Sequence, residues 1–372
     1  MHVYVEDLVP GCILQQDVMK LTAKPLVPKK TVLQEEHLHI LKTFLVESVH
    51  TEAKLVDGTA FQPERQLQEK QKTRGPAKVS LLDDNDSFTN RYLRAVQLFK
   101  KEFQKWQGRL PIEPYTMRQL FLPLYEKEPT NRELLELYHF SDKKNYIYYH
   151  AVAAGVYSAM LGRWLGYEKA DVIQVGLAGM LADCGMARLS YDPFQKKGSL
   201  NKDEFDELKK HPVLSYRMLE KVPGFNKKAM LGVLQHHERL DGSGYPLGVS
   251  KTKVHAFARI TAIADTFHAM TAERLYRAKM SPYHVLEQLA AGEFPGLDQS
   301  MTACFTGHLA MFSVGQSVQL NNENAADVLH IRPDNPLRPV VRLESGQELD
   351  LISHPNLYIV EASASSEAAA SS

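Results

Sequence analysis

The sequence lacks the hallmarks of several protein classes. Its 372 residues include three cysteines, Cys12, Cys184 and Cys304, which are far apart and odd in number. They therefore argue against a disulfide framework and for a reducing compartment. Lys plus Arg and Asp plus Glu each number 44, so no basic surplus attracts a nucleic acid polymer or an anionic membrane. Any polyanionic ligand must be held by a local site.

A secretion signal and long apolar runs are not evident either. The chain begins MHVYVEDLVPG, with acidic residues where a signal peptide needs a basic start and an apolar core. The most apolar long segment, residues 146–162, contains His150 and is shorter than a membrane span. These features predict a cytoplasmic protein without membrane insertion.

The character of the sequence changes along its length, which exceeds that of a usual single domain. Apolar residues recur at helical spacing from residue 88 onward, whereas both ends mix β-branched residues with turn residues. The predicted divisions are an N-terminal accessory domain (1–60), a linker (61–87), a helical connector (88–134), a helical domain (135–315), a β-rich C-terminal extension (316–362) and a disordered tail (363–372). The predicted fold class is mainly α, with a small N-terminal domain of α+β or β-rich structure.

Two carboxylates lie in apolar, helix-like runs. Residues 176–189 read GLAGMLADCGMARL around Asp183, and residues 257–277 read FARITAIADTFHAMTAERLYR around Asp265. Burial of an unpaired charge costs a free energy on the order of several kcal/mol or more. Each of these carboxylates must therefore face water, be paired or bind a metal.

Histidines are placed in the same helical region. Taken alone, His150 is typical of a hydrogen-bonded core residue, and His211, which precedes a proline, could cap a helix. His236 and His237 are harder to explain by packing, because adjacent helical residues point about 100° apart and reach one site only at a helix edge or a frayed end. They are followed by the glycine-rich loop DGSGYP, which contains Asp241.

Together, these histidines and carboxylates indicate a shared metal centre. Imidazole and carboxylate mixtures suit iron, manganese, zinc or similar divalent ions, and a bound metal would convert buried carboxylates from a penalty into a requirement.

The order of these elements resembles the HD-GYP family of HD-domain metal-dependent phosphohydrolases. The resemblance covers about residues 135–315, and HHERLDGSGYP is its most specific part. It implies an HD-domain helical bundle with two divalent metal ions, iron or manganese rather than zinc or magnesium. It also implies hydrolysis of the bacterial second messenger cyclic di-GMP to pGpG or GMP.

The resemblance also implies roles for individual residues. Asp183 would bridge the two metals and, with Asp265, be catalytic. The implied ligands of the first metal are His150, Asp183 and Asp265, and those of the second are Asp183, His211, His236 and His237. The implied substrate-binding residues are Tyr245, Asp241, Arg274 and Arg277.

Three positions depart from the family pattern. The family motif HDIGK reads ADCGM here, so Ala182 replaces a histidine ligand and Met186 replaces a lysine expected near the scissile phosphate. Tyr146 stands where members with a third metal have a glutamate, so a third ion is not expected. The first metal site is therefore expected to be weak or empty. Loss of the lysine alone predicts a rate lower by about 10² to 10³. His268, where the family usually has Asp, is interpreted as a surface or hydrogen-bonded histidine rather than as a group that compensates for these departures.

Several functions remain open from the sequence. The main hypothesis is a cyclic di-GMP phosphodiesterase of reduced activity, and the alternative is a catalytically inactive receptor or interaction module that keeps one metal and a nucleotide pocket. A third, hydrolysis of another nucleotide or phosphoester, is disfavoured by the GYP loop. The predicted partners are a cyclic dinucleotide and either a second copy of the chain or a signalling protein.

Overall fold

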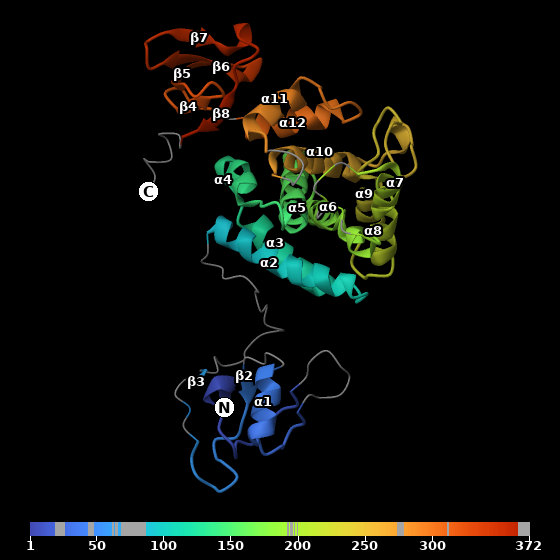
Figure 1. Ribbon diagram of the computed structural model, residues 1–372, viewed down its shortest axis with the longest axis vertical. Coiled ribbons are helices and arrows are strands. Elements are labelled where there is room, and N and C mark those ends of the chain that lie inside the picture. The colour runs from blue at the N-terminus through green and yellow to red at the C-terminus, as the bar shows by residue number, and fades with distance from the viewer. Residues whose placement is uncertain are drawn as a thin grey trace. The chain divides into compact units, whose positions relative to one another are not determined.

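A computed structural model shows the arrangement of the helices and strands (Figure 1). It describes residues 1–18, 27–43, 48–61, 63, 66–67, 87–191, 193, 196, 198, 200–273, 279–310 and 312–363. The chain divides into two compact units, Met1–Lys78 and Val79–Ser372.

The N-terminal unit is a small α+β structure, as predicted. Strand β1 (His2–Tyr4) pairs antiparallel with β2 (Ser48–His50) on one side and with β3 (Gln66–Leu67) on the other. Helix α1 (Glu35–Thr43) contributes Leu38 and Leu41 to the core of this unit. Strand β3 lies in the segment predicted as a linker, most of which is outside the described residues.

Helices dominate the second unit up to residue 309, as the apolar spacing predicts. Helix α2 (Phe88–Gln107) is capped by Ser87, whose hydroxyl accepts a hydrogen bond from the Asn90 amide. Its apolar face joins α3 (Pro114–Glu126) in one hydrophobic core with the helices that follow. Helix α4 (Asn131–Glu136) starts with a capping box between Thr130 and Glu133.

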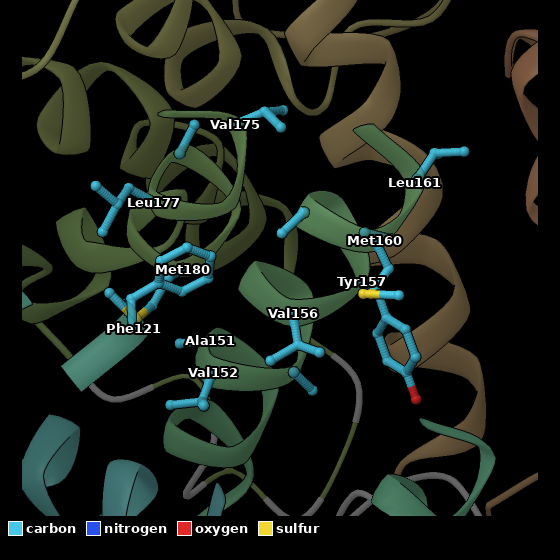
Figure 2. Close-up of a cluster of buried hydrophobic side chains, with 14 of the residues drawn as sticks. Phe121, Ala151, Val152, Val156, Tyr157, Met160, Leu161, Val175, Leu177 and Met180 are labelled. Carbon is cyan, nitrogen blue, oxygen red and sulfur yellow. The ribbon is translucent and has the colours of Figure 1, made fainter. Parts of the chain in front are cut away.

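Two apolar helices, α5 (Tyr146–Trp164) and α6 (Lys169–Leu181), form the centre of this core. Figure 2 shows Val156, Tyr157, Met160 and Leu161 of α5 together with Val175, Leu177 and Met180 of α6 and Phe121 of α3. Glycines let the helices approach closely: a Cβ atom at Gly179 would lie 2.7 Å from the Ala154 carbonyl oxygen. By composition the segment Lys169–Arg188 could cross a membrane, but 67% of it is buried in the structure, as in a core helix.

A substitution at Gly176 tests how much this close packing contributes to the stability of the protein. A Cβ atom there would lie 2.1 Å from Cζ of the fully buried Phe121, so Gly176→Ala should destabilise the protein by roughly 1–3 kcal/mol through overpacking. The matched control is Gly307→Ala in α12 (Gln299–Leu309), where no atom lies within 4 Å of the added Cβ and a gain of up to ~1 kcal/mol is expected. Chemical denaturation of both variants checks this, and equal stabilities would contradict it.

Two of the next helices pack on α6. Helix α9 (Lys227–Gln235) contacts α6, α8 (His211–Leu219) and α10 (Ala256–Thr271), while α10 also packs on α5. Helix α7 (Lys202–Leu208) precedes α8, and α11 (Pro282–Ala290) packs against α12 and α10.

The chain ends in an antiparallel five-stranded sheet with its own small core, which confirms the predicted β-rich extension. Its strand order is β7 (Glu348–Asp350), β6 (Asn335–Leu343), β5 (Ala325–Arg332), β4 (Ser317–Leu320) and β8 (Ile359–Ala362). The sheet contacts α11, where Arg338 Nη2 lies 3.1 Å from Oε2 of Glu287. The predicted disordered tail lies outside the described residues except for Ser363.

Candidate metal centre

The turn after α6 places Asp183 beside the first residue of α8. The hydroxyl of Ser215 accepts a hydrogen bond from the Gly185 amide and donates one to the Ala182 carbonyl, both at 2.7 Å. A Cβ atom at Gly185 would lie 2.3 Å from the His211 carbonyl oxygen, so only glycine lets this turn pack directly on α8. The close approach brings the Asp183 carboxylate to the His211 imidazole.

Four side chains from three parts of the chain meet here. Asp183 Oδ1 lies 3.1 Å from Nε2 of His211 and 3.6 Å from Nε2 of His236. Helix α9 ends at Gln235, so His236 and His237 stand at its terminus and both rings reach the same group. The members of this group, called the second cluster, are Asp183, His211, His236 and His237, whose ligand atoms lie within 4.8 Å of one another.

The hydrogen bonds of the imidazoles leave lone pairs facing the centre of the second cluster. His211 Nδ1 lies 2.7 Å from the Leu208 carbonyl oxygen, and His236 Nδ1 lies 2.6 Å from that of Val233. Because a carbonyl only accepts hydrogen bonds, each Nδ1 carries the proton. The two Nε2 atoms lie 3.2 Å apart, and within the described residues the buried Asp183 Oδ1 accepts no hydrogen bond. Such a set of converging acceptors fits a cation.

The electrostatics of the second cluster show that Asp183 attracts positive charge. Burial opposes charge on His236, but the Asp183 carboxylate outweighs burial and raises the pKa of that imidazole. Burial and the neighbouring His236 hold the pKa of His237 well below its usual range, so His237 stays in the neutral form that binds metals. Burial disfavours the Asp183 carboxylate, yet His211 and His236 hold its pKa well below its usual range.

A first cluster with fewer groups lies next to the second and shares Asp183 with it. Nε2 of His150, on α5, lies 2.9 Å from Asp265 Oδ1, on α10, and 3.6 Å from Asp183 Oδ2. The ligand atoms of His150, Asp183 and Asp265 lie within 4.8 Å of one another. Ala182 adds no donor, so this cluster has three groups. Both clusters could hold a divalent metal ion.

His268 supports the first cluster from behind. Its Nδ1 lies 3.1 Å from Nδ1 of His150, so one ring donates to the other. The side chain is fully buried on α10. Of the two sequence interpretations of His268, the hydrogen-bonded one is therefore confirmed and the surface one is wrong.

Five of the six cluster residues line a cavity of about 320 Å³: His150, Asp183, His211, His237 and Asp265. Of the other residues that the sequence singles out, Tyr146, Met186 and Tyr245 line this cavity. The Tyr146 ring stacks on His150 with centroids 5.1 Å apart, and the Tyr245 ring lies 4.7 Å from that of His237.

The structure does not bring Asp241 to the cavity. Its carboxylate is exposed in a turn, where Oδ1 accepts hydrogen bonds from the amide and hydroxyl of Ser243. Arg274 and Arg277 lie outside the described residues. The substrate-binding roles of these three residues stay predictions.

Sequence reasoning missed two residues of the loop between α9 and α10. Arg239 lines the cavity, and its guanidinium donates to the carbonyls of His236 and Glu238. Glu238 is buried and accepts hydrogen bonds from the amides of Leu247 and Val249 at 2.6 and 3.1 Å. The sequence did hold a signal for both residues, because they are charged and directly follow two candidate ligands at the end of a helix.

Glu238 should hold the loop that carries Tyr245. Glu238→Gln keeps the size of the side chain but replaces one charged acceptor with an NH₂ donor, which faces an amide donor. We expect a loss of about 1.5–3 kcal/mol of stability and faster hydrogen exchange at the amides of Leu247 and Val249. The exposed Glu220→Gln serves as control. Unchanged exchange at both amides would rule out this role for Glu238.

Comparison with known proteins agrees with this geometry. Residues 133–295 match a family model described as HD domain. This part of the chain is therefore similar to HD domains. The chain is similar to the cyclic di-GMP phosphodiesterase PA4108 of Pseudomonas aeruginosa, with 29% identity over 211 residues, 56% of this chain and 50% of that protein. It is also similar to 3'3'-cGAMP-specific phosphodiesterase 3 of Vibrio cholerae, with 35% identity over 138 residues, 37% of this chain and 30% of that protein.

A solved structure supports the fold of the HD domain and its flanking regions. Bd1817, an HDG"Y"P protein from Bdellovibrio bacteriovorus, matches with a TM-score of 0.50 and 12% identity over 84% of this chain and 99% of that one. With these relatives the predicted resemblance to the HD-GYP family is confirmed. The chain spans half the length, or less, of the two curated relatives.

Proposed function

We propose that the chain is a metal-dependent phosphodiesterase that hydrolyses a cyclic dinucleotide, cyclic di-GMP in the first instance. The observation that carries the proposal is the pair of clusters that share Asp183 in the wall of one cavity. The relatives named above act on cyclic di-GMP or on 3'3'-cGAMP, which supports this class of substrate.

The proposed ligands of the ions are the members of the two clusters. His211, His236 and His237 would hold one ion, His150 and Asp265 the other, and Asp183 both. Iron or manganese is the proposed metal, because the resemblance to the HD-GYP family implies these ions and mixed imidazole and carboxylate donors suit them. Such ions, when bound, would supply the positive charge that stabilises the reacting phosphodiester and lowers the pKa of water.

Other groups of the protein would orient the proposed ligands and affect the rate. The carbonyls of Leu208 and Val233 orient the rings of His211 and His236, and His268 orients His150. Met186 offers the phosphate no charge, so the rate is proposed to be reduced.

A receptor function remains the second candidate, because Ala182 and Met186 remove a ligand and a charge from the same motif. The predicted cytoplasmic location and the homodimer or signalling partner also stay predictions.

Incubation of the manganese-loaded chain with cyclic di-GMP tests the enzymatic function. We expect pGpG or GMP to accumulate with the wild type and not with His236→Ala, because His236 belongs to the second cluster. A parallel incubation with 3'3'-cGAMP compares the two nucleotides. Saturable binding without product would favour the receptor, and neither binding nor product would overturn both functions.

A further inference from the structure

A second cavity, of about 310 Å³, adjoins the first, and both are lined by Met186 and Pro193. Helix α5 also lines both cavities, and the turn before it lines the second. Tyr146 and His150 line the first cavity, whereas Lys144 and Tyr148 line the second. A ligand that extends from the clusters into the second cavity therefore crosses the side chain of Met186.

The first cavity is small for a complete cyclic dinucleotide. Pockets for small molecules usually measure about 300–1,000 Å³, and the first cavity is at the lower end of this range. A cyclic dinucleotide has two bases and two phosphodiesters on opposite sides of one ring. When one phosphodiester lies at the clusters, the other half of the molecule needs further space.

The lining of the second cavity fits that other half. Tyr148 and Tyr191 present aromatic rings to it, and aromatic rings bind bases by stacking. The Tyr148 ring is fixed by edge contact with Phe103, at 5.5 Å between centroids, and the Tyr191 hydroxyl donates to the Glu204 carbonyl. Fixed rings lose little conformational entropy when a base stacks on them.

Lys144 supplies a cation at the second cavity. Within the described part of the chain, its ammonium makes neither an ion pair nor a hydrogen bond, whereas its neighbour Lys143 pairs with Glu273 at 3.0 Å. The side chain of Lys144 is exposed and free to turn toward an anion. Met186, which stands where the family has a lysine, thus lies between the two clusters and the ammonium of Lys144.

We propose that the second cavity is the subsite for the non-reacting half of the cyclic dinucleotide. Its base stacks on the tyrosine rings, its phosphate pairs with Lys144, and the thioether of Met186 packs against the nucleoside between the cavities. Soft sulfur makes favourable contacts with aromatic rings, which gives Met186 a binding role in place of the missing charge. This inference rests on the proposed substrate class.

Calorimetry on the manganese-loaded full chain tests the subsite. The probes are the bisphosphorothioate analogue of cyclic di-GMP, which resists cleavage, and inorganic phosphate, which needs only the first cavity. For Lys144→Gln we expect the ratio of the two affinities, analogue over phosphate, to fall about tenfold. Ser190→Phe, which fills the second cavity from an exposed position, should lower the ratio at least as much. Lys143→Gln is the matched control and should keep the wild-type ratio.

The outcomes separate this inference from the function on which it rests. If the wild type binds the analogue and both Lys144→Gln and Ser190→Phe keep its affinity ratio, the second cavity is not the subsite and the proposed function stands. If Lys143→Gln lowers the ratio as much as Lys144→Gln, the effect is one of general charge and the subsite is wrong. If the wild type does not bind the analogue, the proposed substrate fails and the subsite fails with it.

Discussion

Asp183→Asn is expected to abolish metal binding at both clusters and to lower hydrolysis by about 10³-fold or more. The substitution keeps the size of the side chain but removes the carboxylate that the two clusters share. In the second cluster, the remaining groups would be three imidazoles, of which His211 and His236 have Nε2 atoms 3.2 Å apart. Without the anion, nothing in this cluster would offset the charge of a divalent ion. In the first cluster, only His150 and Asp265 would remain.

Metal content and thermal melting check this prediction independently of activity. A ligand that binds only the folded protein stabilises it, so manganese should raise the melting temperature of the wild type but not that of Asp183→Asn. Asp206→Asn makes the same chemical change at an exposed carboxylate of α7 and should respond to manganese as the wild type does. A metal content of Asp183→Asn equal to that of the wild type would show that Asp183 is not a ligand that the clusters share.

Ala182→His is expected to raise the metal content from about one ion per chain to two. The first cluster has three groups, and position 182 directly precedes the shared Asp183 at the end of α6. A histidine there would add a neutral donor to a site that already contains two carboxylates, which should strengthen it. Hydrolysis should rise with occupancy of this site, while Met186 keeps the rate below that of a protein with a lysine at its position.

A double variant locates the additional ion. His150→Ala in the Ala182→His background removes another group of the first cluster and should return the metal content to about one. If the second ion persisted in the double variant, it would bind elsewhere. A wild type that already contains two ions would show instead that three protein groups suffice at the first cluster.

Local sequence patterns predicted the helices and the terminal strands well. These elements depend on residues that are close together in the sequence. In α2, apolar residues at three- and four-residue spacing become its buried face, and in α5 and α6 the small residues permit close packing. The terminal sheet follows from β-branched residues between turns. Strand β3 was not predicted, since two residues carry too little pattern and their pairing with β1 is decided by tertiary contacts.

Convergence of the candidate ligands could be predicted only in part. Apolar surroundings marked Asp183 and Asp265 as unusual and indicated a shared metal centre, but their proximity depends on helix packing. It was the resemblance to a family that divided the candidate ligands between two ions. Asp241 shows the limit of motif reasoning, because its turn with Ser243 accounts for its carboxylate. Glu238 and the second cavity depend on contacts distant in sequence, which spacing along the chain does not encode.

The contact between the terminal sheet and α11 bears on where this protein can be shortened. The Glu287 carboxylate is buried, and burial raises its pKa although Arg338 of the sheet opposes the shift. A chain cut at residue 315, the predicted domain boundary, would keep this carboxylate and lose its guanidinium partner. The hydroxyl of Ser281 would also lose the carbonyls of Ile359 and Val360 to which it donates. The C-terminal strands thus complete the helical unit, so expression of this protein calls for a boundary beyond β8.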